Sequence, residues 1–262
     1  MCKKVEIPIF VINLKQDKER LLFMQKQFEA NGKDFRVIEA IDGNNLSSEQ
    51  YATYSKERSL ACKKRELSNG EIACVLSHIK AWELIIEENF DEALILEDDV
   101  FLSKSLFKVL ENREKLPADY EFINFRTDVF QFPFGKYIYG NFRASNLYGY
   151  ANGNVAYLIN IKGIKKLLNN VYPIRLPADD LTGRTHITDV ISYGIYPEVT
   201  FLNKFPSSIW GMEVFDKPNF MSLKRQQLSH IIYLIVRFFG LSWLLLKFSK
   251  LVYFSFPKFR RR

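Results

Sequence analysis

Apolar residues in this chain form two kinds of pattern, short continuous runs and longer stretches with helical spacing. Continuous runs are typical of strands buried on both faces of a sheet, and they predict strands near residues 7–14, 35–40, 93–96, 120–125, 155–160 and 191–201. Apolar positions spaced three and four apart predict helices over about 17–31, 70–88, 101–115 and 163–169. Because strands and helices alternate, we expect an α/β fold with a mixed, mainly parallel sheet flanked by helices.

Two segments lack such a pattern. Residues 44–68 are polar and charged, so they form either a loop or helices that cover a site. Residues 173–184 include Pro173 and Pro177, and we expect them to be irregular.

One predicted strand runs directly into three carboxylates. Residues 93–96 are followed by Glu97, Asp98 and Asp99, and apolar residues resume at once. Three adjacent carboxylates repel one another, and a divalent cation such as Mg²⁺ or Mn²⁺ relieves that repulsion. In open α/β sheets, ligands bind at the carboxyl ends of the strands. Taken alone, the triplet fits a solvated acidic turn equally well.

The charge of the chain is concentrated at its end. The 262 residues carry a formal net charge of +7, and from Lys224 onward there are nine Lys or Arg residues and no Asp or Glu. The preceding part is therefore close to neutral, which argues against a nucleic-acid-binding body. We expect residues 1–223 to form a catalytic domain and residues 224–262 a basic appendage.

This appendage has the pattern of an amphipathic helix. Its apolar stretches are too short to span a bilayer, and four cationic positions fall within an arc of about 160° on a helical wheel: His230, Arg237, Lys247 and Lys250. Such a helix is predicted to lie in a membrane interface with its cations against anionic lipids. A helix packed on the domain itself or on a second subunit is the alternative.

The spacing of the cysteines and the first residues of the chain indicate in which cellular compartment the protein is expected. Cys2, Cys62 and Cys74 form no C-x-x-C pair, so neither a zinc site nor a disulfide framework is indicated, and reduced structural thiols are expected. The apolar run that starts the chain is too short for a signal peptide. We therefore expect a cytoplasmic protein that works in the cytosol or on its membrane face.

Several short motifs, each weak alone, together resemble glycosyltransferase family 25, the lipopolysaccharide and lipooligosaccharide sugar transferases. The resemblance extends over about residues 7–209 and leaves out the tail. It rests on 11–14 with Asp17 and Arg20, 40–43, 70–74 with Ser77 and His78, 96–100, 156–159 with Lys162 and Gly163, 177–179 and 207–209.

This resemblance implies a GT-A-like, Rossmann-like fold that uses a UDP-hexose and inverts the anomeric carbon to form a β-linkage. It implies that Asn13, Leu14 and Arg20 lie near the nucleotide, with Asp98 also on the donor side. The acidic triplet corresponds to the family's metal motif, with Glu97 in place of the first Asp. Asp99 is the leading candidate ligand of Mn²⁺ or Mg²⁺, and Glu97, or alternatively Asp98, completes the site. Ser77 and His78 are further donor-site candidates, although a lone histidine is more often structural.

Transfer also requires a base that takes the proton of the acceptor hydroxyl. Its carboxylate should be remote in sequence from the metal triplet, because it acts on the opposite face of the sugar. Asp179 and Asp180 fit this requirement, and Asp179 better matches the family's Pro-x-Asp pattern. Asp128 and Asp189 are reserves, and a charged surface turn is the alternative for the Asp179–Asp180 pair.

Together these features predict an inverting transferase at the cytoplasmic face of the inner membrane. It would move galactose or glucose from UDP-galactose or UDP-glucose onto a lipooligosaccharide core, with anionic lipids and no nucleic acid as partners. Two rivals stay open: a sugar nucleotidyltransferase, and a non-catalytic, membrane-associated assembly protein with a degenerate transferase domain. The oligomeric state is not predicted.

Overall fold

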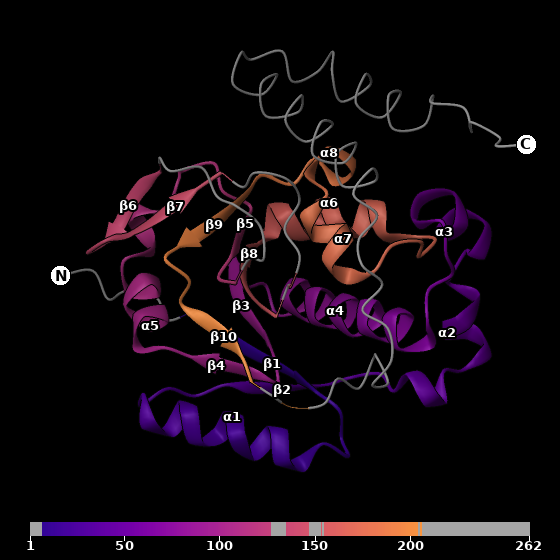
Figure 1. Ribbon diagram of the computed structural model, residues 1–262, viewed down its shortest axis with the longest axis horizontal. Coiled ribbons are helices and arrows are strands. Elements are labelled where there is room, and N and C mark those ends of the chain that lie inside the picture. Colours follow the sequence, from indigo (N-terminus) through magenta and orange to yellow (C-terminus); the bar gives the residue numbers. More distant parts are fainter. Residues whose placement is uncertain (1–6, 127–134, 147–152, 154, 204, 206–262) are drawn as a thin grey trace, which may run out of the picture.

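The computed structural model describes residues 7–126, 135–146, 153, 155–203 and 205 (Figure 1). Asp128 and the predicted tail, residues 224–262, lie outside this part. The strands are β1 (Ile9–Asn13), β2 (Arg36–Glu39), β3 (Glu92–Glu97), β4 (Val100–Leu102), β5 (Phe122–Asn124), β6 (Lys136–Tyr139), β7 (Phe142–Ser145), β8 (Ala156–Asn160), β9 (Ser192–Tyr196) and β10 (Thr200–Leu202).

Eight α-helices and two 3₁₀ turns accompany these strands in the described part of the chain. The α-helices are α1 (Lys18–Ala30), α2 (Ser48–Ala52), α3 (Lys56–Lys63), α4 (Asn69–Glu87), α5 (Lys104–Glu111), α6 (Ile161–Val171), α7 (Ala178–Gly183) and α8 (Thr185–Thr188). The 3₁₀ turns are η1 (Gly43–Asn45) and η2 (Arg113–Lys115). None of the helices described is long and apolar enough to cross a membrane.

The main sheet has the strand order β2-β1-β3-β8-β5-β9-β7-β6. β1 runs parallel to both β2 and β3, and β5 runs parallel to β9. β8 joins these two parallel parts by antiparallel pairing on both of its sides, and the β6–β7 hairpin closes the far edge. β4 and β10 form a separate antiparallel ribbon. The predicted mixed α/β fold with flanking helices is confirmed.

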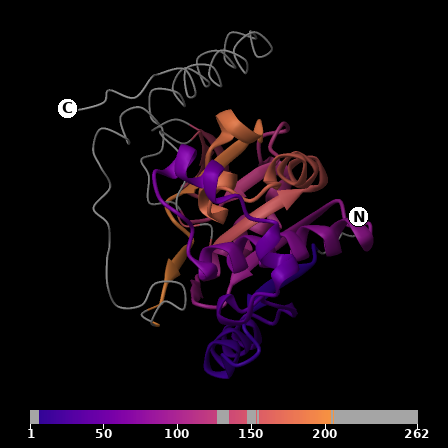
Figure 2. The ribbon, with the colours of Figure 1, turned by 90° about the vertical axis from the view of Figure 1, so that its right-hand side faces the viewer.

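Helices cover both faces of the sheet because successive residues of each central strand point to opposite sides. In β3, Ala93 and Ile95 pack with α4, α6 and α7, whereas Leu94 and Leu96 pack with α1 and α5. Figure 1 shows α1 on one side of α4 and the pair α7–α8 on the other, and in Figure 2 the indigo α1 again lies at the bottom of the described chain. Because helices cover both faces of the sheet, both faces of the central strands are buried, and this explains why these strands are continuous apolar runs in the sequence.

Helix starts follow from serine caps. Ser68 and Glu71 form a capping box that begins α4, and Ser47 with Gln50 does the same for α2. Residues 44–68, predicted as a loop or as covering helices, therefore include α2 and α3. Residues 173–184, expected to be irregular, contain α7 instead; this expectation was wrong because Pro177 ends the extended segment and leaves Ala178 free to start a helix.

The segment after β2 is fastened to α4 by close packing. A Cβ atom at Gly43 would lie 2.7 Å from Cα of Gly70, so only glycine fits there. The backbone N–H of Ile41 donates to Oγ of Ser77 at 2.9 Å. Residues 41–43 and α4 therefore form one packed unit.

Candidate active site

The acidic triplet lies where β3 ends beside β1. Ile12 is paired with Glu97 in the parallel ladder, so the next residues, Asn13 and Asp98, emerge together at the carboxyl edge of the sheet. Asp98 and Asp99 form the turn that leads into β4. Strand register thus places the triplet at the sheet edge where α/β proteins bind ligands.

Asp98 is held by two other residues that sequence reasoning assigned to the donor site. Nδ2 of Asn13 donates to its Oδ2 at 2.7 Å, and Nη1 of Arg20 donates to its Oδ1 at 2.7 Å. Asp98 is almost fully buried, and the Arg20 side chain is only 11% exposed. Both oxygens of Asp98 are therefore engaged within the protein, which makes it an anchor for the turn.

The other two carboxylates have much weaker compensation. Burial and the neighbouring charges of Asp179 and Asp98 raise the pKa of Glu97 to about 8, against the lowering effect of Arg20 and Arg126. Burial and the charge of Glu97 raise the pKa of Asp99 to about 7. These shifts mean that the metal-free site resists carrying both negative charges at once.

Asp99 also has an unsatisfied oxygen. Its Oδ1 is buried without a hydrogen-bond partner among the described residues, and its Oδ2 lies 3.5 Å from Nη1 of Arg20. A buried carboxylate oxygen without a donor is costly unless something supplies positive charge. Glu97 and Asp99 consequently have the donor chemistry of a site for a hard divalent cation.

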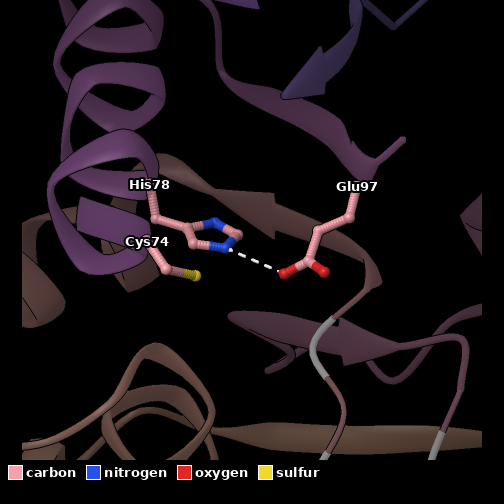
Figure 3. A group of neighbouring side chains, drawn as sticks. All are labelled: Cys74, His78 and Glu97. Atoms are coloured by element: carbon pink, nitrogen blue, oxygen red, sulfur yellow. Dashed lines mark ion pairs between the residues drawn. The ribbon is translucent and has the colours of Figure 1, made fainter. Parts of the chain in front are cut away.

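His78 stands beside Glu97 as a neutral imidazole. Its Nδ1 lies 2.8 Å from the hydroxyl oxygen of Tyr157, which also accepts a hydrogen bond from Nε1 of Trp82 at 3.0 Å. Its Nε2 lies 3.5 Å from Oε1 of Glu97 (Figure 3). Burial lowers the pKa of His78 to about 4, although the charge of Asp179 opposes this. The imidazole is therefore uncharged at neutral pH.

Cys74 shares this face of α4, one turn before His78. Figure 3 shows both side chains projecting from the helix on the side where Glu97 lies. A ligand atom from each of Cys74, His78 and Glu97 lies within 4.8 Å of the other two. Burial and the surrounding carboxylates raise the pKa of the Cys74 thiol well above its ordinary value.

The two base candidates have different surroundings. Asp179 is partly buried, and its Oδ2 accepts the backbone N–H of Gly153 at 3.0 Å. Its negative charge adds to the raised pKa values of Glu97 and Cys74 and partly opposes the lowering of the pKa of His78, so Asp179 lies close to the same site.

Asp180 points into the protein instead. Its Oδ2 lies 2.9 Å from Nη2 of Arg184 and 2.5 Å from Nζ of Lys63, and its side chain is 4% exposed. Burial would raise the pKa of Asp180, but these two cations outweigh it and lower the pKa. Asp180 is therefore a buried member of an ion cluster, and we do not retain it as a base.

The other predicted residues, Ser77, Leu14 and Asp189, make the following contacts in this structure. Ser77 uses its hydroxyl within the protein, donating to the carbonyl of Ala73 and accepting from Ile41. The carbonyl of Leu14 accepts the N–H of Asp17 at the start of α1. Asp189 is 46% exposed near Lys166, on the surface. The prediction from the sequence missed the His78–Tyr157–Trp82 network; the four-residue spacing of Cys74 and His78 was the available signal for the cluster.

A pocket opens at the carboxyl ends of β1 and β2. Its volume is about 330 Å³, and it is mostly polar. Its walls come from the segments that follow the two strands and from α2 and α4: Lys15, Gln16, Glu39, Ala40, Ile41, Asp42, Asn45, Gln50 and Lys80. Two of these residues, Lys15 and Lys80, are cationic, and two, Glu39 and Asp42, are acidic.

The chain is similar to known proteins over most of the described part. Residues 6–182 match the sequence model described as Glycosyltransferase family 25 (LPS biosynthesis protein). The human protein named procollagen galactosyltransferase 2 is 27% identical over 227 residues, covering 82% of this chain and 36% of its own. A glycosyltransferase 25 family member from Anopheles gambiae is 31% identical over 182 residues, covering 66% of this chain and 30% of its own.

A solved glycosyltransferase involved in glycosylation of the major capsid of PBCV-1 aligns with a TM-score of 0.29 and 13% identity, over 63% of this chain and 66% of its own. At that score the likeness bears on neither fold nor function. The chain spans about a third of the length of the curated relatives it matches.

Proposed function

Since the chain belongs to glycosyltransferase family 25, we propose that it transfers galactose or glucose from the corresponding UDP-sugar to a saccharide acceptor, with inversion to a β-linkage. The observation that carries the proposal is the pair Glu97 and Asp99. Both carboxylates have raised pKa values, one has an orphaned buried oxygen, and both lie at the carboxyl edge of the sheet.

Glu97 and Asp99 would hold Mn²⁺ or Mg²⁺. A bound divalent cation neutralises the charge that develops on the leaving diphosphate. Asp98 supports this role indirectly, because Asn13 and Arg20 fix its carboxylate and so fix the turn that presents its two neighbours. Arg20 thereby acts as a positioning residue for the turn.

The polar pocket would hold the nucleoside and the start of the diphosphate. It lies at the carboxyl ends of β1 and β2, the same edge of the sheet at which β3 ends, and its Lys15 and Lys80 would contact the phosphates. Asp42 and Asn45 add hydrogen-bonding groups for a ribose or a base.

Asp179 would act as the base. It comes from α7, a different element from the β3 turn that carries the triplet, and its negative charge acts on Glu97. A carboxylate there can accept the proton of an acceptor hydroxyl while the cation pair stabilises the leaving group. Its contact with the N–H of Gly153 fixes the orientation of the carboxylate.

The proposed acceptor is the core of a lipooligosaccharide at the cytoplasmic face of the inner membrane. In support, the matching family carries the description of a lipopolysaccharide biosynthesis protein. The basic residues from Lys224 onward fit an anionic membrane surface. We further propose that residues 1–223 suffice for catalysis and that residues 224–262 recruit the chain to the lipid.

A screen of UDP-sugars with defined core oligosaccharides, with and without Mn²⁺, tests this function. We expect UDP release that EDTA abolishes and that Asp99→Asn reduces by at least about 100-fold. Full transfer by Asp99→Asn in EDTA would contradict the cation role. Release of pyrophosphate instead of UDP would identify a nucleotidyltransferase, and failure to bind any UDP-sugar would favour the non-catalytic alternative.

A further inference from the structure

We infer that Cys74, His78 and Glu97 form a second kind of cation site, one for a thiophilic divalent ion such as Zn²⁺. The three side chains offer one sulfur, one nitrogen and one oxygen, and these atoms all lie within 4.8 Å of one another (Figure 3). Sulfur and imidazole ligands select Zn²⁺ or Co²⁺, whereas the all-oxygen pair Glu97 and Asp99 suits Mn²⁺ or Mg²⁺.

The backbone preorganises two of the three ligands. Cys74 and His78 are four residues apart in the middle of α4, a 19-residue helix, so their side chains lie one above the other on one face. Glu97 is the last residue of β3, which packs under that face. A rigid helix and a buried strand end hold ligands more accurately than loops do.

His78 is aimed into the cluster, with its second nitrogen 3.5 Å from Oε1 of Glu97. The residue is 1% exposed, and among the described residues Nε2 has no hydrogen-bond partner. Such a buried, unpartnered nitrogen is costly unless a ligand uses it. Its lone pair would be satisfied by a cation.

The partners of the other ring nitrogen suit this role. A hydroxyl oxygen accepts two hydrogen bonds, so Tyr157 can accept Nδ1–H of His78 alongside Nε1–H of Trp82. That tautomer turns the Nε2 lone pair toward Glu97. Metal-ligating histidines are typically oriented by such a contact to their second nitrogen.

The distances are compatible with tetrahedral coordination. Bonds of about 2.0–2.3 Å to zinc separate neighbouring ligand atoms by about 3.3–3.8 Å. Nε2 of His78 and Oε1 of Glu97 are already 3.5 Å apart, and no pair exceeds 4.8 Å. Closing on a cation requires shifts of about 1 Å. Three protein ligands leave the fourth position to water, and the Cys74 thiol releases its proton to the buffer on binding.

Occupation of this site has a consequence that rests on the proposed function. Glu97 belongs both to this cluster and to the pair proposed for Mn²⁺, so it cannot serve two cations fully. Zn²⁺ bound by Cys74 and His78 would withdraw Glu97 from the catalytic cation. We therefore expect Zn²⁺ to inhibit transfer and excess Mn²⁺ to relieve the inhibition only partly, because sulfur and imidazole favour Zn²⁺.

Titration of the metal-free full-length protein with Co²⁺ tests the site without any activity assay. We expect the near-ultraviolet absorption of a cobalt–thiolate bond at one equivalent, and its loss on addition of Zn²⁺. Cys74→Ser should remove the absorption and raise the Kd for Zn²⁺ by at least about 100-fold, and Tyr157→Phe should raise it about 10-fold. Cys62→Ser is the matched control, because Cys62 is a cysteine on α3 that forms no disulfide and lies outside the cluster; it should behave as wild type. Equal absorption in Cys74→Ser, or its loss in Cys62→Ser, would overturn the proposal.

A measurement on the wild-type chain covers the case in which a variant does not fold. Zn²⁺ should slow alkylation of Cys74 at least about 10-fold, read by peptide mass spectrometry, and leave Cys62 unaffected. Unchanged alkylation of Cys74 at saturating Zn²⁺ would refute the site. These readouts are independent of transfer, so Zn²⁺ binding without transfer would refute the transferase alone, and transfer without Zn²⁺ binding would refute this site alone.

Discussion

The neighbours Asp179 and Asp180 allow a sharp test, because one faces the site and the other is buried in an ion cluster. In Asp180→Asn, Arg184 loses its carboxylate partner while its side chain stays 0% exposed. Breaking a buried ion pair from one side costs about 3–5 kcal/mol of unfolding free energy. For a domain of this size, that lowers Tm by roughly 6–20 °C. Lys63 softens the loss, since its side chain is 19% exposed and regains water.

The assay is urea and thermal unfolding of Asp180→Asn and Asp179→Asn, followed by circular dichroism. Asp179→Asn should change the unfolding free energy by about 1 kcal/mol or less, because asparagine still accepts the N–H of Gly153 and no longer repels Glu97. Asp179→Asn should nevertheless lose turnover while UDP-sugar binding persists. Equal stability of the two variants would refute the assignment of Asp180 to the ion cluster.

The pH dependence of the same variant adds a second check. Burial opposes ionisation of Asp180, but Arg184 and Lys63 hold its pKa below 3.8. A lowered carboxyl pKa stabilises the fold at every pH above the unfolded value, and that contribution is lost as the pH falls through the folded pKa. The stability gap between wild type and Asp180→Asn should therefore stay constant from pH 7 to pH 5 and shrink only below 3.8. A gap that closes near neutral pH would contradict this pairing.

Three further predictions concern the site and its support. The pKa of Glu97 is raised from 4.5 to about 8, so between these pH values the folded chain holds a proton that the unfolded chain releases, and the stability of the wild type in EDTA falls as the pH rises. Between pH 5 and pH 9, the unfolding free energy of Glu97→Gln in urea should gain roughly 2–4 kcal/mol relative to wild type. Unfolding free energies that change in parallel with pH in the two proteins would contradict the shift. Gly43→Ala should cost about 1–3 kcal/mol through its contact with Gly70, and an unchanged urea midpoint would show that the segments separate easily. Ser77→Ala should cost about 1–3 kcal/mol of unfolding free energy, because the N–H of Ile41 loses its acceptor. UDP affinity is measured alongside, and a loss of affinity larger than the loss of stability would indicate that Ser77 contacts the donor directly.

The pattern of apolar residues was sufficient to predict the central strands and long helices. The runs at 93–96 and 155–160 correspond to β3 and β8, and Ser68 marks the start of α4. The antiparallel pairing of β8 between β3 and β5 could not be predicted, because a continuous apolar run does not encode strand direction. Helix α7 was missed because six residues carry too little periodicity.

The sequence allowed the types of residue in the candidate site to be predicted, but not the contacts that these residues make. The triplet was visible as three adjacent carboxylates, but its division into Asp98 and the other two depends on Asn13 and Arg20, which are 85 and 78 residues away in sequence. His78 acquires its orientation from Tyr157, 79 residues later. Such contacts arise from strand register and helix packing, so they become visible only when the chain is folded.

The attachment of residues 41–43 to α4 joins the polar pocket to the helix that carries His78. One wall of the pocket and α4 form a single packed unit, through Gly43 against Gly70 and Ile41 on Ser77. If the pocket holds the nucleoside as proposed, that wall cannot shift relative to His78 without breaking this packing. A sugar attached through a diphosphate and one attached through a monophosphate would then present the anomeric carbon at different depths, so the packed unit would discriminate between these two classes of donor.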